Sequence, residues 1–313
     1  MAIDKSFLDN FIKATEFAAY GASPFIGKGN KIAADQGAVD KMRDVLNTID
    51  MKGNIVIGEG EMDKAPMLHI NEKVGKNIGP ELDIAVDPLE GTTFTSKGLP
   101  NAFSVLAVAE KGNLLSAPDT YMEKIIIGKN LPKNLLDLDY SIEKNINLLS
   151  QAMNKKPSDL NACVMKRTRH NNIVNVLVKL GVKINYITDG DIAGALTVIG
   201  ERPKNDIYLG TGGGPEGVIV AAALSCLGGQ MQGRLVLNDE EIIRAKKLGI
   251  TDLKKKYNID EIVKGDVIFC ASGVTNGDLA KGIKNFEDRF EVTTLALHKS
   301  QNVNKTITNT YNK

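Results

Sequence analysis

Residues 83–93 read DIAVDPLEGTT and close an apolar, β-rich run that begins at residue 82. Such a run predicts a strand, and Asp87 follows it directly. Pro88 then fixes a turn before a second acid, Glu90, which a glycine and two threonines follow. Two carboxylates on one tight loop repel each other unless a cation neutralises them, and their oxygens suit Mg²⁺ or Mn²⁺. The stretch therefore predicts a sheet strand that ends in a metal-binding loop.

A second acidic stretch, IGEGEMD at residues 57–63, also follows a predicted strand. In an open α/β sheet, the loops at the carboxyl ends of strands diverge and leave a crevice for ligands. Glu59 and Glu61 are therefore candidate metal ligands, although a GEGE tract by itself is more often a solvated turn. Asp35 lies near the start of a predicted helix, where an acid is usually a cap or a partner of the helix dipole. The three histidines show no zinc spacing.

The pattern of the whole chain predicts an α/β protein whose amino-terminal half is α+β. Helices are expected where apolar residues recur every three or four positions: residues 6–19, 34–49, 142–153, 172–180, 192–199, 217–227 and 240–248. Strands are expected at short β-rich runs: residues 54–57, 82–86, 103–109, 162–165, 183–187, 206–209 and 266–270. The alternation beyond residue 158 predicts a sheet with helices on both faces.

A chain of 313 residues is long enough for two domains. The polar segment KKPSD at residues 155–159 contains proline and is the expected joint. We therefore expect a metal-binding α+β domain at residues 1–157 and a substrate-binding α/β domain at residues 158–313. The closing β-rich segments, residues 290–297 and 305–310, could pack on either sheet.

The charge balance argues against nucleic-acid or membrane partners, because 39 Lys and Arg face 38 Asp and Glu. The longest uncharged apolar run, residues 217–229, is shorter than the ~20 residues that span a bilayer. The chain has three cysteines, Cys163, Cys226 and Cys270, which form no CxxC pair. Such an odd, sparse count is typical of buried thiols in a reducing compartment. We therefore expect a cytoplasmic protein.

Three polar motifs follow predicted strands of the second domain. KRTRH at residues 166–170 could grip a phosphate with its guanidinium groups or form a solvated helix start. DGD at residues 189–191 could hydrogen-bond sugar hydroxyls or form a turn and a helix cap. GTGGGPEG at residues 210–217 contains a formal GxGxxG, but Glu216 would repel a pyrophosphate and Pro215 removes an amide donor. This loop fits a metal that bridges to a phosphate better than it fits a dinucleotide.

Together, the motifs resemble those of class II, GlpX-type fructose-1,6-bisphosphatases, within the lithium-sensitive sugar phosphatase superfamily. The resemblance extends over residues 6–297. It rests on AAD at 33–35, IVIGEGE at 55–61, DIAVDPLEGT at 83–92, APDTYMEK at 117–124, RH at 169–170, DGD at 189–191 and GGGPEG at 212–217. One motif differs, because Arg167-Thr168-Arg169-His170, preceded by Lys166, stands where other members have Lys-Pro-Arg-His.

The resemblance implies a layered α-β-α-β-α fold and the hydrolysis of the 1-phosphate of fructose-1,6-bisphosphate in gluconeogenesis. The implied ligands of Mn²⁺ or Mg²⁺ are Asp35, Glu59, Asp87, Glu90 and Glu216. The implied catalytic groups, which would orient or deprotonate the attacking water, are Thr92, Glu59 and Glu61. The implied substrate contacts are Glu90, Gly91, Thr92, Tyr121, Arg167, Thr168, Arg169, Asp189, Gly190, Asp191 and Gly213. A homo-oligomer, either a dimer or a tetramer, is also implied.

Two kinds of alternative remain. The chain could be a related enzyme, either one that also uses sedoheptulose-1,7-bisphosphate or one that resembles inositol phosphatases. It could also be a sugar-phosphate-binding regulator without turnover. A regulator would need the phosphate-gripping arginines, but not Thr92 beside a full set of carboxylates.

Overall fold

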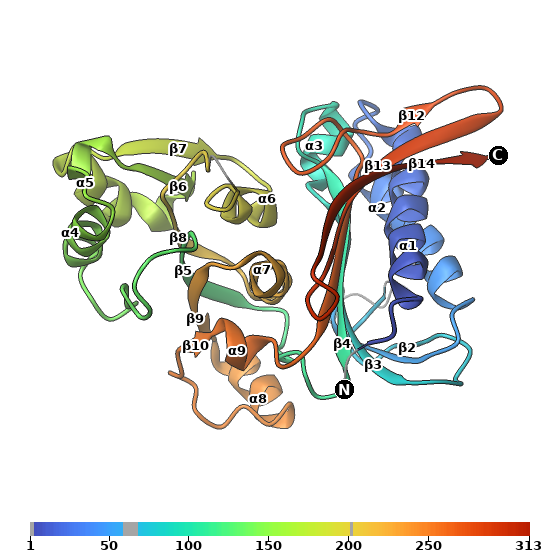
Figure 1. Cartoon of the computed structure of the whole chain (residues 1–313), viewed down its shortest axis with the longest axis horizontal. Helices are drawn as coiled ribbons and strands as arrows, with labels where there is room; N and C mark the ends of the chain where they lie inside the picture. The colour runs from blue at the N-terminus through green and yellow to red at the C-terminus, as the bar shows by residue number, and fades with distance from the viewer. Residues whose placement is uncertain (1–2, 59–67, 201–202) are drawn as a thin grey trace. The chain divides into compact units, whose positions relative to one another are not determined.

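The computed structural model describes residues 3–58, 68–200 and 203–313. The chain divides into two compact units (Figure 1): unit 1 is Met1–Asp119 with Val263–Lys313, and unit 2 is Thr120–Ile262. Unit 2 therefore interrupts unit 1, a division that differs from the joint expected at residues 155–159. That segment connects two elements within unit 2, and the chain returns to unit 1 because its last strands complete the first sheet.

Unit 1 is built on an eight-stranded mixed sheet in the order β12-β13-β11-β4-β3-β1-β2, with β14 paired to β13. Its strands are β1 (Lys52–Ile57), β2 (Lys73–Val74), β3 (Glu81–Glu90), β4 (Phe103–Glu110), β11 (Val267–Gly273), β12 (Lys284–Asn285), β13 (Arg289–His298) and β14 (Val303–Asn312). β1 and β3 pair in parallel, whereas β4 is antiparallel to both β3 and β11. The closing strands β13 and β14 thus belong to the first sheet.

Two helices, α1 (Phe7–Ala22) and α2 (Lys31–Leu46), pack against each other and against this sheet (Figure 1). They approach so closely that a Cβ on Gly21 would lie 2.0 Å from the carbonyl oxygen of Gly37. Glycine is required there because no side chain fits between the two backbones. The short helices η1 (Ser23–Phe25) and α3 (Thr92–Lys97) complete the helices described in unit 1.

Unit 2 is built on a six-stranded mixed sheet in the order β10-β9-β5-β8-β6-β7. Its strands are β5 (Tyr121–Ile127), β6 (Asn161–Met165), β7 (Lys183–Ile187), β8 (Ile207–Gly213), β9 (Gln230–Val236) and β10 (Tyr257–Asn258). β6 pairs in parallel with both β7 and β8, whereas β5 is antiparallel to β8 and β9.

Helices cover both faces of this second sheet, as the sequence predicts. The helices are α4 (Ile142–Ala152), η2 (Pro157–Asp159), η3 (Thr168–His170), α5 (Asn171–Lys179), α6 (Asp191–Leu196), α7 (Gly214–Leu227), α8 (Asp239–Lys247) and α9 (Ile259–Ile262). Val164 of β6 belongs to the core that α4 and α5 share. Its neighbour Cys163 points to the other face, where a Cβ on Gly194 of α6 would lie 3.4 Å from Sγ. α7 packs against β5 on that face too, because a Cβ on Gly217 would lie 2.6 Å from Sδ of Met122.

The fold class expected from the sequence is confirmed, because both sheets are mixed and both carry helices. Each predicted helix and strand overlaps an observed one, but β5 and β9 are missing from the prediction. Polar residues, Glu123 and Lys124 in β5 and the glutamines of β9, interrupt the apolar residues of these strands. In the described part of the chain, no helix is long and apolar enough to cross a bilayer.

Asp266 connects the amino-terminal segment to the sheet of unit 1. Its Oδ2 accepts hydrogen bonds from the backbone N–H of Ile3 and from Oγ of Ser300, both at 2.8 Å. The Nε2 atom of His298 lies 3.0 Å from the same oxygen, and the N–H groups of Val267 and Ser300 donate to Oδ1 at 2.9 Å. Burial raises the pKa of this carboxyl, but the hydrogen bonds outweigh burial and hold the pKa below its ordinary value.

We expect Asp266→Asn to lower the free energy of unfolding at pH 7 by about 1–3 kcal/mol, because buried donors lose a charged acceptor. The folded-state pKa lies below the ordinary value of 3.8, so the stabilisation is fully present above that pH and is lost as the pH falls through the folded-state pKa. Urea unfolding at pH 7, 5 and 3 measures the difference, which should shrink only at pH 3. The control is Asp44→Asn on exposed α2 surface, and an equal difference at all three pH values would contradict the prediction.

Candidate metal and phosphate sites

The predicted metal loop lies where β3 ends in unit 1. Asp87 and Glu90 are buried, with 7% and 6% of their surface exposed, and the N–H of Leu89 donates to Oδ1 of Asp87 at 3.1 Å. The pairing of β3 with β4 is irregular between Asp87 and Glu90, where Pro88 lies. In a regular strand, residues three apart point to opposite faces. The irregularity removes that constraint from the two carboxylates.

Gly91 separates the strand from α3. Its φ of +82° is the left-handed conformation, and a Cβ there would lie 3.0 Å from the ring of Phe94. Gly91 is also the N-cap residue of α3, so Thr92 is the first helical residue and its hydroxyl caps no helix. Within the described residues this hydroxyl makes no hydrogen bond, and the side chain is half-buried. Thr92 therefore does not cap α3.

Asp35 lies in the second turn of α2, with 8% of its surface exposed. The N-cap of this helix is Asn30, whose side chain accepts from the N–H of Ala33 at 3.0 Å, so Asp35 is not the cap. α2 packs against β3 and α3, and Nζ of Lys31 donates to Oγ1 of Thr93 at 2.8 Å. The helix that carries Asp35 is thus attached to the helix that follows the metal loop.

β1 runs parallel to β3, with Ile57 paired to Ala85, so the carboxyl ends of both strands lie at one edge of the sheet. Glu59 and Glu61, which follow β1, lie outside the described residues. Among the residues described, no three His, Cys, Asp or Glu side chains form a metal site by themselves. The expected donors are all carboxylates, two of them on this loop, and this donor set fits a hard divalent cation.

The expected substrate contacts of unit 2 lie at a single edge of its sheet. β6, β7 and β8 are parallel neighbours, so the segments that follow them, residues 166–170, 188–191 and 213–216, begin at the same edge. Tyr121 starts the antiparallel strand β5 and pairs with Gly213, which places it at this edge too. The strand pairing thus brings to one edge of the sheet the segments that the sequence motifs identify one by one.

The two arginines of the basic motif are exposed and make different contacts. Nε of Arg169 donates to the carbonyl of Thr211 at 2.9 Å, and its guanidinium lies 4.7 Å from the ring centroid of Tyr121. Nη1 of Arg167 donates to the carbonyls of Lys166 and Thr188 at 3.0 and 2.8 Å. Arg169 is therefore held by its Nε and its ring contact, with both Nη groups left for a ligand.

His170 is buried and holds the glycine loop. The N–H of Thr211 donates to Nε2 at 2.8 Å, so Nε2 is the acceptor, and we assign the ring proton to Nδ1, 2.7 Å from the carbonyl of Met165. A Cβ on Gly210 would lie 3.0 Å from the ring. Both nitrogens contact the backbone, so His170 links the end of β6 to β8.

The acidic residues next to the glycines are tightly packed. A Cβ on Gly213 would lie 1.7 Å from Oε2 of Glu216 in the first turn of α7. Gly190, with a φ of +78°, is the N-cap of α6, and its N–H bonds to Oδ1 of Asp189 at 3.1 Å. Asp191 is buried, and its two oxygens bond to Nζ of Lys124 and to the hydroxyl of Tyr208. Lys124 ends the APDTYMEK motif and Tyr208 lies outside the motifs, and nothing in the sequence pairs either residue with Asp191.

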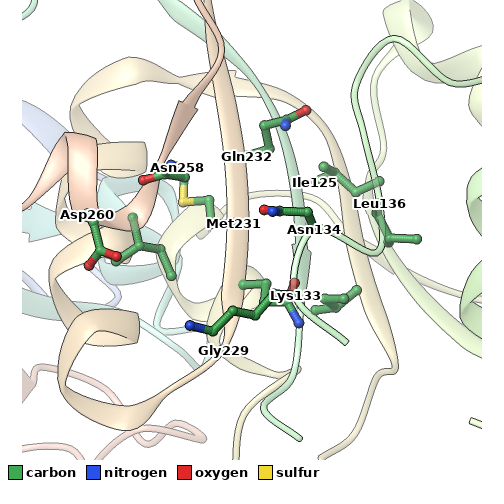
Figure 2. A pocket seen from close by; sticks show the side chains of 12 residues that line it. Ile125, Lys133, Asn134, Leu136, Gly229, Met231, Gln232, Asn258 and Asp260 are labelled. Atoms are coloured by element: carbon green, nitrogen blue, oxygen red, sulfur yellow. The ribbon is translucent and has the colours of Figure 1, made fainter. Parts of the chain in front are cut away.

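A cavity of about 210 Å³ lies at the opposite end of β5 (Figure 2). Its apolar lining residues include Ile125, Ile127 and Met231, which are buried, whereas the lining residues Lys133 and Asp260 are exposed. None of the predicted site residues lines it, and Lys133 is its single cationic lining residue among those described. A sugar bisphosphate carries several negative charges, so the arginine edge fits such a ligand better than this cavity does.

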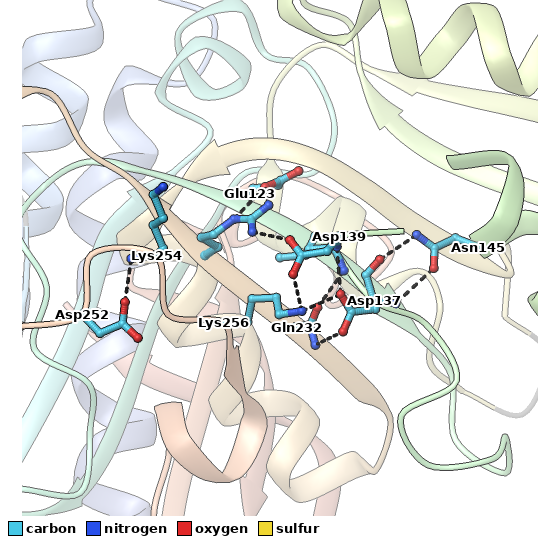
Figure 3. A network of polar contacts seen from close by, with 10 residues as sticks. Glu123, Asp137, Asp139, Asn145, Gln232, Asp252, Lys254 and Lys256 are labelled. Atoms are coloured by element: carbon cyan, nitrogen blue, oxygen red, sulfur yellow. Dashed lines mark hydrogen bonds and ion pairs between the residues drawn. The ribbon is translucent and has the colours of Figure 1, made fainter. Parts of the chain in front are cut away.

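A charge network stabilises the chain beside this cavity (Figure 3). Nζ of Lys256 lies 2.6 Å from both Asp137 and Asp139, and Arg234 bonds to Asp139 at 2.6 Å and to Glu123 at 2.8 Å. The two cations lower the pKa of the Asp139 carboxyl. These contacts attach the loop after β5 to β9 and to the segment before β10, which is a structural role.

The family is evident from comparison with known proteins. The profile of the family described as "Bacterial fructose-1,6-bisphosphatase, glpX-encoded" matches residues 5–311. The chain is 40% identical over 311 residues to a fructose-1,6-bisphosphatase class 2 of Haemophilus influenzae, covering 94% of this chain and 93% of that protein. It is also 40% identical to a D-fructose 1,6-bisphosphatase class 2/sedoheptulose 1,7-bisphosphatase of Synechococcus sp. (strain JA-3-3Ab), covering 91% and 90%. The chain therefore belongs to the family of GlpX-type, class 2 fructose-1,6-bisphosphatases, which are phosphatases.

Solved structures give weaker likenesses. The suhB extragenic suppressor protein of Bartonella henselae matches with a TM-score of 0.35 and 12% identity, covering 63% of this chain and 74% of that one. An inositol monophosphatase from Anabaena matches with a TM-score of 0.32 and 15% identity, covering 61% and 69%. Likenesses at this level carry no argument about the chain.

The position of Thr92 at the start of α3 leads to a prediction about activity. We expect Thr92→Ala to lower the rate of phosphate release by about 10²- to 10⁴-fold, the range for a positioned proton-transfer group. The melting temperature should change little, because the hydroxyl caps no helix. Thr92→Ser keeps the hydroxyl and should retain much of the activity. Equal, small losses in both variants would show that the hydroxyl does not handle the water.

Proposed function

We propose that the chain hydrolyses the 1-phosphate of fructose-1,6-bisphosphate to fructose-6-phosphate and inorganic phosphate, as in gluconeogenesis, with Mn²⁺ or Mg²⁺ held by unit 1. Its support is the family membership and the similarity to a class 2 fructose-1,6-bisphosphatase over most of both chains. The structural observation that carries the proposal is the irregular carboxyl end of β3. Two buried carboxylates there, Asp87 and Glu90, precede Thr92, whose hydroxyl does not cap α3.

The proposed chemistry follows from this loop. Divalent cations supply charge neutralisation at the phosphate and lower the pKa of an attacking water. Asp35, Asp87 and Glu90 would hold the cations, with Glu59 and Glu216 as further proposed ligands. The hydroxyl of Thr92 would hydrogen-bond the water. The oxygen of the water would bond to phosphorus as the bond between phosphorus and the sugar oxygen breaks.

Proton transfer completes the proposed reaction. The water loses a proton to Glu59 or Glu61. The departing sugar oxygen takes a proton from solvent to become a hydroxyl, and the glutamate returns its proton to solvent afterwards. Both glutamates come from the predicted acidic stretch after β1, whose carboxyl end lies at the same sheet edge as that of β3. Positioning the water and the carboxylates before reaction reduces the entropic cost of the attack.

The second phosphate is the proposed ligand of the arginine edge in unit 2. Arg169 is supported by Tyr121 and Thr211, and Arg167 by Thr188, so their guanidinium groups are partly ordered before a ligand arrives. A preorganised guanidinium loses less entropy on binding than a free one. The other proposed substrate contacts of unit 2 at this edge are Thr168, Asp189, Gly190, Asp191 and Gly213. In unit 1, Gly91 would contact the substrate.

Sedoheptulose-1,7-bisphosphate is a second candidate substrate, because the Synechococcus relative is named for both activities. Both sugars carry a phosphate at each end, so the same two sets of residues could hold either one. A phosphate-release screen over the two bisphosphates and inositol-1-phosphate compares these possibilities with the inositol-phosphatase alternative, and a regulator would release no phosphate. The proposal includes a cytoplasmic location and a homo-oligomer, either a dimer or a tetramer. Size-exclusion chromatography with light scattering measures the molar mass and so decides the number of subunits.

Metal dependence is the first consequence of the proposal. We expect no phosphate release from metal-free protein, and recovery when Mg²⁺ or Mn²⁺ is added, because the carboxylates repel a phosphate until cations neutralise them. Asp87→Asn should abolish recovery and weaken metal binding measured by calorimetry. Asp83→Asn is the matched control on the same strand, since Asp83 is buried and its carboxylate accepts from the N–H of Gly112 at 2.6 Å. Full activity in excess chelator would refute metal dependence.

The arginine edge gives a prediction about substrate affinity. We expect Arg169→Ala to raise KM for fructose-1,6-bisphosphate about tenfold or more, since a charged hydrogen bond contributes about 1.5–3 kcal/mol. Arg169→Lys should recover only part of the loss, because lysine lacks the planar group that lies over Tyr121. Lys179→Ala on the exposed surface of α5 is the control. An unchanged KM would move the phosphate site, with Lys166 as the next residue to test.

A further inference from the structure

Lys124, Asp191 and Tyr208 form a buried polar triad inside unit 2. Nζ of Lys124 bonds to Oδ2 of Asp191, and the hydroxyl of Tyr208 donates to Oδ1. Nζ also donates to the carbonyl oxygen of Gly213 at 2.8 Å. The exposed fractions are 1%, 4% and 0%, so the three side chains are almost entirely removed from water.

This burial limits what the triad can do. Lys124 has no access to solvent, so its ammonium cannot contact a phosphate at the surface. Both oxygens of Asp191 already accept a hydrogen bond, from Lys124 and from Tyr208. Burial and the neighbouring Asp191 raise the pKa of Tyr208, so the phenol remains a donor. The triad is therefore engaged internally, and a direct contact between Asp191 and a sugar hydroxyl is not required.

The triad joins two loops of the proposed substrate edge. Asp191 ends the DGD segment and begins α6, whereas Gly213 ends β8 and is the N-cap of α7. Lys124 bonds to both from β5, the strand that Tyr121 starts. The packing is tight at this point, because a Cβ on Gly212 would lie 2.0 Å from Oδ2 of Asp191.

We propose that Lys124 is a positioning residue, which together with Asp191 and Tyr208 fixes the DGD loop against the glycine loop so that both meet the sugar phosphate in one geometry. The inference rests on the proposed function for its substrate, but the contacts that carry it lie wholly within unit 2. A buried ion pair is often no more stabilising than apolar side chains of the same size. Stability alone therefore does not account for this pair, whereas fixing the orientation of two segments does.

The test removes both charges together, because removing one leaves the other buried and unpaired. The main variant is K124M/D191N. The matched control is K155M/D206N, another ion pair of unit 2, in which Nζ of Lys155 lies 2.6 Å from the buried Asp206. Asp206 immediately precedes β8, whereas Gly213 ends that strand, so the control lies at the opposite end. Two readouts are measured: hydrogen–deuterium exchange without ligand, and steady-state kinetics with fructose-1,6-bisphosphate.

In K124M/D191N we expect faster exchange at residues 189–191 and 212–214, and KM raised about tenfold or more, with kcat changed by less than about threefold. The control should show neither effect. Wild-type exchange and wild-type KM in K124M/D191N would overturn the proposal and leave the triad a structural charge pair. If that variant does not fold, Tyr208→Phe decides by the same two readouts, because it removes one hydrogen bond and keeps the ring. If the wild-type protein released no phosphate, the proposed function would be refuted. The positioning role of the triad would still be tested, because the exchange measurement needs no substrate.

Discussion

Parallel pairing of neighbouring strands is the constraint on which both candidate sites depend. Neighbouring parallel strands end at the same edge, so the loops that follow them are brought together whatever their distance along the chain. In unit 2 this applies to β6, β7 and β8, and in unit 1 to β1 and β3. A shift of one residue in either pairing would turn the side chains to the opposite face. The register of the strands therefore determines which side chains reach each edge.

Close packing of carboxylates against glycine is a second feature of the candidate site in unit 2. The GxGxxG pattern at residues 212–217 has the spacing of a dinucleotide loop, yet its glycines have a different task here. Gly212 makes room for Asp191, and Gly213 makes room for Glu216. The pattern is therefore explained by neighbouring acids and not by a pyrophosphate. The glycine spacing alone does not distinguish a dinucleotide site from this packing, whereas Asp191 and Glu216 do.

Much of the fold follows from local pattern, because the helices and most strands have the expected periodicity. β5 and β9 are harder to predict, since Lys124 is a charged residue in a strand that is buried on both faces. Its partner Asp191 lies 67 residues away, so no local window contains the pair. The interruption of unit 1 is hard to predict for the same reason, because β11 pairs with β4 across more than a hundred residues of sequence. The acids, proline and glycine of residues 87–91 are contiguous and stand out in the sequence, but the strand extends to Glu90, where a loop is expected, and the ligand roles remain proposals.

The interruption of unit 1 affects the order in which the two sheets can form during synthesis. Leu114 and Val263 form a bridge, and the N–H of Lys264 donates to the carbonyl of Asn113 at 2.8 Å, so the chain leaves unit 1 and re-enters it at neighbouring points. A ribosome releases all six strands of unit 2 before it releases β11, β13 and β14. Because domains generally fold as units, the inserted part has its complete sheet while the first sheet still ends at β4. The nascent metal-loop strand β3 is therefore already paired on both sides at a stage when β4 has one open edge waiting for β11.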